Sequence, residues 1–197
     1  MATILPFAGL WPRIHPTAFV APTATIIGNV TVGEEASIWF GAVIRGDEPD
    51  HVIQVGARTS IQDNVVLHVS DRGPTIIGSD CTVGHGAVLE SCTVGDGALI
   101  GMNAVVLQRA TIGEGALIAA GATVAEGAQI PPRHLAAGVP AKVKKELEGS
   151  SAGWVGKGGA HYVRLSREYL RAGIGRVDEV DGTAHVKDIH ESTSAEA

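Results

Sequence analysis

The hydrophobic positions of this chain recur every six residues over the stretch from Val83 to Ile130. One column of the repeat holds β-branched aliphatic residues, and a second column, four residues further on, holds alanine. The aliphatic column contains Val94, Ile100, Val106, Ile112, Ile118, Val124 and Ile130, and the small column contains Ala98, Ala104, Ala110, Ala116, Ala122 and Ala128. A chance run of small residues would not keep both columns in phase, so we interpret the segment as a structural repeat.

A period of six residues is too short for a helical repeat and does not match a heptad. It suits a short strand followed by a turn. The alanine and the next aliphatic residue lie two positions apart, so both point to the same side of a strand, which we expect to be the interior. Three such units would close one triangular coil, and stacked coils would bury a continuous aliphatic column. The pattern therefore predicts an all-β solenoid, a parallel β-helix of hexapeptide repeats.

The same period begins upstream at Ile26, and polar segments interrupt it at residues 45–51 and 70–74. A third irregularity is a step of five residues instead of six, which falls at Glu90 and Ser91. Breaks in a solenoid map to loops, and loops often carry function. We therefore expect the chemistry of this protein at these three places.

The end of the repeat divides the chain into three parts. We predict a β-helix domain over residues 1–135, C-terminal helices over 136–175 and a disordered tail over 176–197. The first helix is expected from Ala141 to about Glu148, because Pro140 precedes it. A Gly/Ser linker is expected over 149–159 and a second helix from about 160 to 171, where a broad apolar face appears. The tail is polar and lacks a period.

Composition excludes several classes of partner. The net charge of −6 and the sequence pI of about 5.7 give no electrostatic attraction to nucleic acid or to an anionic membrane. No apolar run is long enough for a transmembrane helix, and no basic segment of a signal peptide precedes the mildly apolar N-terminus. Cys81 and Cys92 stand in matching Cys-Thr-Val-Gly units and fit the small column as reduced thiols, which favours a cytoplasmic protein. A disulfide between them is the alternative.

Motifs of a known family lie at or near the irregular places. These are Arg45-Gly46-Asp47, Ile61-Gln62-Asp63-Asn64 with His68 six residues after Gln62, and Val83-Gly84-His85. With them the chain resembles the gamma-class carbonic anhydrase family of left-handed β-helices, over most of its length. The resemblance implies left-handed coils, a homotrimer, and a metal site between neighbouring subunits that acts on carbon dioxide and bicarbonate.

The resemblance also implies the metal ligands. His68 matches the first histidine ligand, and His85 matches the ligand that the adjacent subunit supplies. The position of the third histidine holds Glu90. Three neutral imidazoles leave Zn²⁺ its full charge and lower the pKa of its water to about 7, whereas a glutamate ligand makes that water less acidic. Two histidines and a glutamate bind zinc in hydrolases and also suit Fe²⁺, so we expect Zn²⁺, with Fe²⁺ or Co²⁺ possible.

Six further residues complete the expected site. By resemblance, Gln62 orients metal-bound solvent, Glu48 shuttles protons and Tyr162 reaches the site from a C-terminal helix. Charges at the trimer interface are expected at Arg45, Asp47 and Asp63. Each role has a plainer alternative: a solvated loop for the charged residues, a packing position for Tyr162, and solvent-facing or interface side chains in place of the three ligands.

Three classes of function follow. The resemblance implies an enzyme, a carbonate dehydratase (lyase) that hydrates carbon dioxide reversibly. A second class is a different enzyme on the same trimer, either a metal-assisted hydrolase or thioesterase, or a hexapeptide acyltransferase with a histidine base. The third is a non-catalytic trimeric scaffold or a binder of a siderophore or another small ligand.

Overall fold

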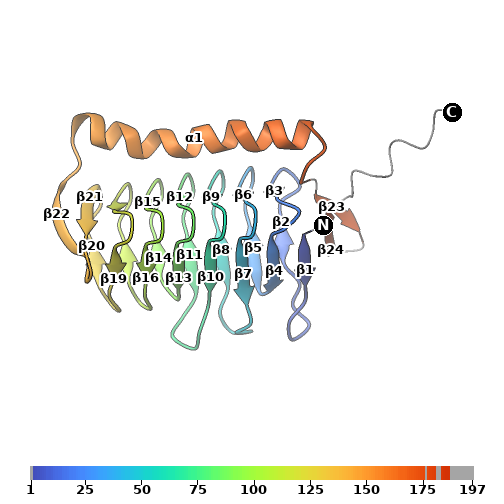
Figure 1. The fold of residues 1–197 in the computed structure, drawn as a ribbon. Coiled ribbons are helices and arrows are strands. Elements are labelled where there is room, and N and C mark those ends of the chain that lie inside the picture. The colour runs from blue at the N-terminus through green and yellow to red at the C-terminus, as the bar shows by residue number, and fades with distance from the viewer. Residues whose placement is uncertain (1, 176, 181–182, 187–197) are drawn as a thin grey trace.

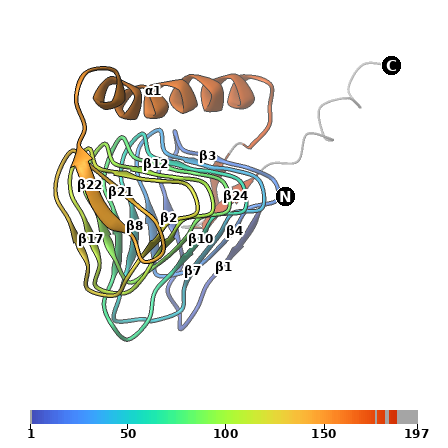
Figure 2. The same ribbon diagram turned by 60° about the vertical axis from the view of Figure 1, so that its left-hand side comes forward.

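A computed structural model describes residues 2–175, 177–180 and 183–186 of the chain. Three parallel sheets wrap around one another as the faces of a triangular prism, and a long helix lies along one face (Figures 1 and 2). The predicted parallel β-helix of hexapeptide repeats is confirmed. Each coil contributes one short strand to each sheet, as the six-residue period requires.

Sheet I has the strand order β1-β4-β7-β10-β13-β16-β19, all parallel. Its strands are β1 (Thr3–Leu5), β4 (Thr25–Gly28), β7 (Val43–Gly46), β10 (Val66–His68), β13 (Val88–Glu90), β16 (Val105–Val106) and β19 (Thr123–Val124).

Sheet II follows sheet I along each coil, in the order β2-β5-β8-β11-β14-β17-β20. Its strands are β2 (Arg13–Ile14), β5 (Val30–Val32), β8 (Ile53–Val55), β11 (Thr75–Ile77), β14 (Thr93–Val94), β17 (Thr111–Ile112) and β20 (Gln129–Ile130).

Sheet III closes each coil, in the order β3-β6-β9-β12-β15-β18-β21-β22. Its strands are β3 (Phe19–Val20), β6 (Ser37–Ile38), β9 (Ser60–Ile61), β12 (Thr82–Val83), β15 (Leu99–Ile100), β18 (Leu117–Ile118), β21 (His134–Ala137) and β22 (Lys142–Glu146). Every pairing is parallel except that of β21 with β22.

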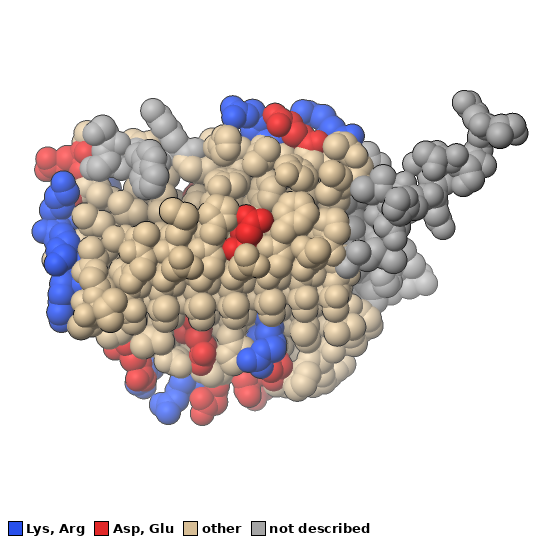
Figure 3. All heavy atoms as spheres, viewed as in Figure 1, with Lys and Arg blue, Asp and Glu red and all other residues tan. Residues whose placement is uncertain are grey.

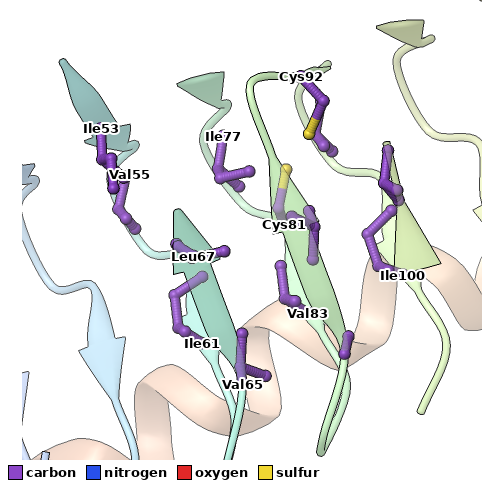
Figure 4. Close-up of a cluster of buried hydrophobic side chains, with 14 of the residues drawn as sticks. Ile53, Val55, Ile61, Val65, Leu67, Ile77, Cys81, Val83, Cys92 and Ile100 are labelled. Atoms are coloured by element: carbon purple, nitrogen blue, oxygen red, sulfur yellow. The ribbon is translucent and has the colours of Figure 1, made fainter. Parts of the chain in front are cut away.

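The core is the stack of in-register aliphatic residues that the period predicts. In sheet I, for example, Ile26, Ile44, Leu67 and Leu89 are partners on successive strands, and all four are fully buried. Figure 4 shows side chains from the three faces meeting in this interior. The solenoid begins before Ile26, because Ile14 already pairs with Val32 in the same arrangement.

The two cysteines occupy the small column, as predicted. Cys81 and Cys92 are both buried free thiols, and Figure 4 shows them inside the coils. Burial raises the pKa of each thiol to about 12, because a thiolate would lose its hydration there. The alternative of a disulfide between them is wrong.

The C-terminal segment differs from the two predicted helices. The residues of the first predicted helix form β22, which pairs antiparallel with β21 and covers the last edge of sheet III. Backbone pairing at an open edge thus outweighs the local helix signal. The predicted linker 149–159 is the first half of a single helix, α1 (Gly149–Arg171).

Helix α1 lies along sheet III, and its glycines explain why it contains a linker-like sequence. A Cβ atom at Gly159 would lie 3.1 Å from the Asp80 carbonyl oxygen, and one at Gly158 would lie 3.0 Å from the Thr82 hydroxyl. Glycine therefore lets the helix approach the sheet. Further along α1, Tyr162 and Tyr169 pack edge-on against Trp39, with ring centroids 5.6 and 5.4 Å away.

In the predicted disordered tail, β23 (Val177–Val180) and β24 (Thr183–Val186) form an antiparallel hairpin. Residues 176, 181–182 and 187–197 of that prediction lie outside the described residues. Within the described chain, α1 included, no helix is both long and apolar enough to cross a membrane.

Candidate metal site

Three irregular loops leave the solenoid at one edge, where sheet I ends and sheet II begins. They are residues 6–12 after β1, 47–52 after β7 and 69–74 after β10, and they protrude along the lower edge in Figure 1. The last two are the polar interruptions found in the sequence. The side chains at the ends of the sheet I strands therefore lie beside these loops.

Arg45, His68 and Glu90 form an outward-facing ladder at this edge. They are direct partners on β7, β10 and β13, while the residue before each one points into the core. Strand alternation fixes this orientation, since Leu67 and Leu89 must stay buried. Residues that are far apart in the sequence are thus brought together by stacking.

His68 lies between two carboxylates. Its Nε2 atom is 3.1 Å from Asp47 Oδ1, and its Nδ1 atom is 3.4 Å from Glu90 Oε2. Arg45 forms an ion pair with Asp47 in the same chain. Burial alone would raise the pKa of Asp47, but hydrogen bonds from Arg45 and the backbone lower that pKa below its ordinary value. Asp47 is therefore an anion beside the imidazole.

Glu90 is held toward His68 by a residue that the sequence analysis missed. The Nε2 amide of Gln108 donates a 2.7 Å hydrogen bond to Glu90 Oε1. Burial would raise the pKa of Glu90, but the hydrogen bonds from Gln108 and His68 lower it. The next residue, Ser91, has a left-handed φ of 45°, which is where the five-residue step ends the strand. Glu90 is thus an ionised ligand candidate with 29% of its side chain exposed.

His85 stands at the opposite edge of sheet I, in the turn after β12. Its Nδ1 atom is 2.8 Å from Asp63 Oδ2, and its backbone N–H donates a 3.2 Å hydrogen bond to the Gln62 side-chain oxygen. The carboxylate of Asp63 favours the tautomer with a proton on Nδ1, which leaves Nε2 as the ligand or base. Within the chain, Asp63 thus pairs with His85.

The structure does not unite the three predicted ligands in one chain. Strand β13 lies between His85 and Glu90 and separates the two edges by about 10 Å, whereas metal–ligand bonds are about 2 Å long. Among the described residues there is no group of three histidine, cysteine or carboxylate side chains able to hold a metal ion. One chain therefore offers two of the predicted ligands, His68 and Glu90, at one edge of sheet I and the third, His85, at the other edge, but no complete site.

The other predicted catalytic residues are spread over both edges. Glu48 follows Asp47 in the first loop, and its side chain makes no hydrogen bond or ion pair with the described residues. Tyr162 lines a cavity with Gln62 and His85, and its ring also packs on Trp39. Burial raises the pKa of Tyr162, and the negative charge of Asp63 raises it further, so the phenol stays protonated.

His68, Glu90 and His85 are chemically suited to bind a divalent metal ion, provided that a second subunit brings its His85 to the His68 and Glu90 of the first. A histidine that binds a metal through one ring nitrogen usually donates its other N–H group to a carboxylate. Both histidines meet this requirement, His85 through Asp63 and His68 through Asp47. Two imidazoles and a carboxylate are ligands for Zn²⁺ or Fe²⁺.

Fold and site together define a hexapeptide-repeat protein, and comparison with known proteins gives its family. The model of the bacterial transferase hexapeptide (six repeats) matches residues 91–126. The chain belongs to the hexapeptide-repeat family that contains the gamma-class carbonic anhydrases. It is 47% identical over 170 residues to a carbonic anhydrase of Geobacillus kaustophilus, covering 86% of this chain and 88% of the relative.

Two other relatives show the breadth of the family. Gamma carbonic anhydrase 2, a mitochondrial protein of Arabidopsis thaliana, is 38% identical over 79% of this chain, which spans 58% of that relative. The crystal structure of a putative acetyltransferase of Bacillus cereus is 43% identical with a TM-score of 0.84, covering 87% of this chain and 98% of that one. Proteins named for different reactions therefore share this fold closely.

Proposed function

We propose that this protein is a gamma-class carbonic anhydrase-like enzyme, which hydrates carbon dioxide reversibly at metal sites between the subunits of a homotrimer. The observation that carries the proposal is the pair His68–Glu90, in register on adjacent strands, with His85 held by Asp63 at the far edge of the same sheet. The identity to a carbonic anhydrase over most of the chain supports it.

The face of sheet I supports the association of copies. A row of outward-pointing valines crosses sheet I on four successive strands, namely Val43, Val66, Val88 and Val105. The first three lie two residues before Arg45, His68 and Glu90, respectively. Val88 is 38% exposed in the isolated chain. Figure 3 shows this face to be largely free of Lys, Arg, Asp and Glu apart from one acidic group near the middle of the view, with the other charges along the rims. Such a surface is typical of a protein interface.

In the proposed site, His68 and Glu90 of one subunit and His85 of the next hold the cation, Zn²⁺ in the first instance and Fe²⁺ or Co²⁺ as alternatives. A bound Zn²⁺ ion acidifies water and so supplies a nucleophile near neutral pH. Asp47 and Asp63 orient the two imidazoles, and the Gln62 amide orients solvent near His85. Glu48, on the adjacent loop, or bulk solvent takes up the proton that hydration releases.

The glutamate ligand changes the expected pH dependence. As a ligand, Glu90 would bring a negative charge where three neutral imidazoles would leave a bound cation its full charge, so water on that cation would be less acidic. We therefore expect the hydration rate to rise at higher pH than in a three-histidine site. Glu90→His should move the rise to lower pH, since Glu90 already lies against His68.

The test combines three measurements on the purified protein. Light scattering gives the oligomeric state, elemental analysis gives the metal content, and stopped-flow indicator assays give carbon dioxide hydration after loading with zinc, cobalt or iron. The proposal expects a trimer and a hydration rate above that of the free metal, which His68→Ala abolishes and Asp71→Asn, in the exposed part of the same edge, leaves unchanged. A monomer, or a rate no higher than that of free metal, contradicts the proposal.

A further inference from the structure

A cavity of about 570 Å³ lies between helix α1 and sheet III. Its floor includes Leu99 on β15, Leu117 on β18 and Leu135 on β21, and Gly158 and Tyr162 of α1 line its helix side. Binding sites for organic molecules typically measure about 300–1,000 Å³ and are mostly apolar with a few polar groups. This cavity has that size and lining, and it is far larger than carbon dioxide requires.

The polar groups gather at one end of the cavity. Gln62 follows β9 and His85 follows β12, whereas Leu117 and Leu135 belong to β18 and β21. Because neighbouring strands lie about 4.8 Å apart, the distance from β9 to β21 is about 19 Å along the solenoid. The cavity is therefore elongated, with a polar end beside His85 and an apolar end over β18 and β21.

The polar end offers hydrogen-bond donors to a neutral acceptor. The Gln62 side-chain oxygen already accepts a hydrogen bond from the His85 backbone, and its other end is an NH₂ group that can only donate. The Tyr162 phenol is protonated and also donates. The nearby Asp63 carboxylate, paired with His85, disfavours a second anion. A carbonyl oxygen fits this end better than a carboxylate does.

The wall of the cavity also holds a buried polar group without a partner. Thr82 is 94% buried, and its hydroxyl has no hydrogen-bond partner among the residues that the structure describes. Gly158 lies over it, since a Cβ there would be 3.0 Å from the Thr82 hydroxyl oxygen. A buried hydroxyl of this kind usually marks a place where water or a ligand completes the bonding.

We propose that this cavity binds the aliphatic chain of an uncharged acyl compound, with the acyl carbonyl between Gln62, His85 and Tyr162. The inference deepens the proposed function in that it takes the site at His85 as the reaction centre. It assigns to the cavity beside that centre a second class of ligand, an ester, thioester or amide with a chain of several carbons.

The experiment measures the binding of linear primary amides, from butanamide to octanamide, to the full-length protein by titration calorimetry. Each methylene that enters the apolar end should lower the dissociation constant by about fourfold. Leu117→Trp fills that end and should abolish the dependence on chain length. Val139→Trp adds the same ring at a 73% exposed position outside the cavity and should leave the dependence intact.

A second variant isolates the head group. Tyr162→Phe should weaken the binding of every amide by a similar factor, about 3- to 10-fold, and keep the increment per methylene, because it removes one hydrogen bond and no apolar contact. If the chain-length dependence is absent in the wild-type protein, or survives in Leu117→Trp, the cavity proposal is overturned.

The outcomes separate this inference from the proposed function. A protein that hydrates carbon dioxide but binds all amides equally keeps the proposed function and rejects the acyl site. A protein that binds the amides as expected but hydrates no carbon dioxide keeps the acyl site and rejects the proposed function. Both measurements are made on the same metal-loaded preparation and on one stripped with a chelator.

Discussion

Replacing Asp63 by Asn tests whether the carboxylate beside His85 prepares that imidazole as a metal ligand. Asp63 Oδ2 lies 2.8 Å from His85 Nδ1, and the substitution keeps the size of the side chain while it removes the charge. Loss of such an outer carboxylate typically weakens metal affinity by 10- to 100-fold. Since 35% of the Asp63 side chain and 44% of the His85 side chain are exposed, solvent screens the pair, and we expect about tenfold.

The assay is a competition titration of zinc against a chelator, with Asp71→Asn as the control. Asp71 is 83% exposed and contacts only Arg72 among the described ion pairs, so its variant should bind zinc like the wild type. Asp63→Asn should also lower the pKa of Tyr162, because the charge of Asp63 is one cause of its elevation, although burial is the larger cause. Tyrosinate absorbance against pH follows this second effect.

Two results would refute the reasoning. An affinity of Asp63→Asn within about twofold of the wild type would mean that the carboxylate does not orient a ligand. Loss of the trimer with unchanged affinity per intact site would instead assign Asp63 to the interface, as the family resemblance implies.

Three further predictions follow from the structure. Leu89→Ala removes a fully buried residue directly before Glu90 and should lower the free energy of unfolding by about 3–5 kcal/mol in urea titrations; a loss below about 1 kcal/mol would contradict the packed core. The pKa values of Asp47 and Glu90 are lowered in the folded protein, so both carboxylates stabilise it above their ordinary values near pH 4, and this stability is lost as the pH falls through the lowered values. The variant Asp47→Asn/Glu90→Gln should therefore lose less stability on acidification, and an unchanged acid dependence would count against these pairs. Cys81 and Cys92, with pKa values of about 12, should react with a thiol reagent only as the protein unfolds, and rapid labelling of the native protein would contradict their burial.

Much of the fold could be predicted because the six-residue period is a local signal. Each aliphatic position, such as Ile100 or Ile118, has the same surroundings in every coil, so one unit predicts the next. The segment 141–159 could not be predicted in this way. Its first part forms a strand because β21 offers an open edge, and its second part forms a helix that rests its glycines on sheet III. Both causes lie far away in the sequence.

The candidate site also combines features that the sequence predicts with contacts that only the stacking of coils creates. The family resemblance implies that His68 and Glu90 lie in one site, and the two residues are partners one coil apart. The hydrogen bond of Gln108 to Glu90 depends on how the next coil stacks after a five-residue step, and Gln108 has no distinguishing pattern around it. The pairing of Asp63 with His85 likewise depends on two turns that meet across coils. Such contacts need the register of the coils and not the period alone.

The central claim is that neighbouring subunits share each site, and mixed trimers test it most directly. His68→Ala and His85→Ala should each be inactive in carbon dioxide hydration. When both variants are co-expressed in equal amounts, each interface has a one-in-two chance of an intact His68 on one subunit and a one-in-two chance of an intact His85 on the next. Random mixing therefore leaves about one interface in four with both histidines. We expect about a quarter of the wild-type hydration rate from the mixture. Activity that stays at the level of the single variants, in trimers confirmed to be mixed, would contradict the shared site.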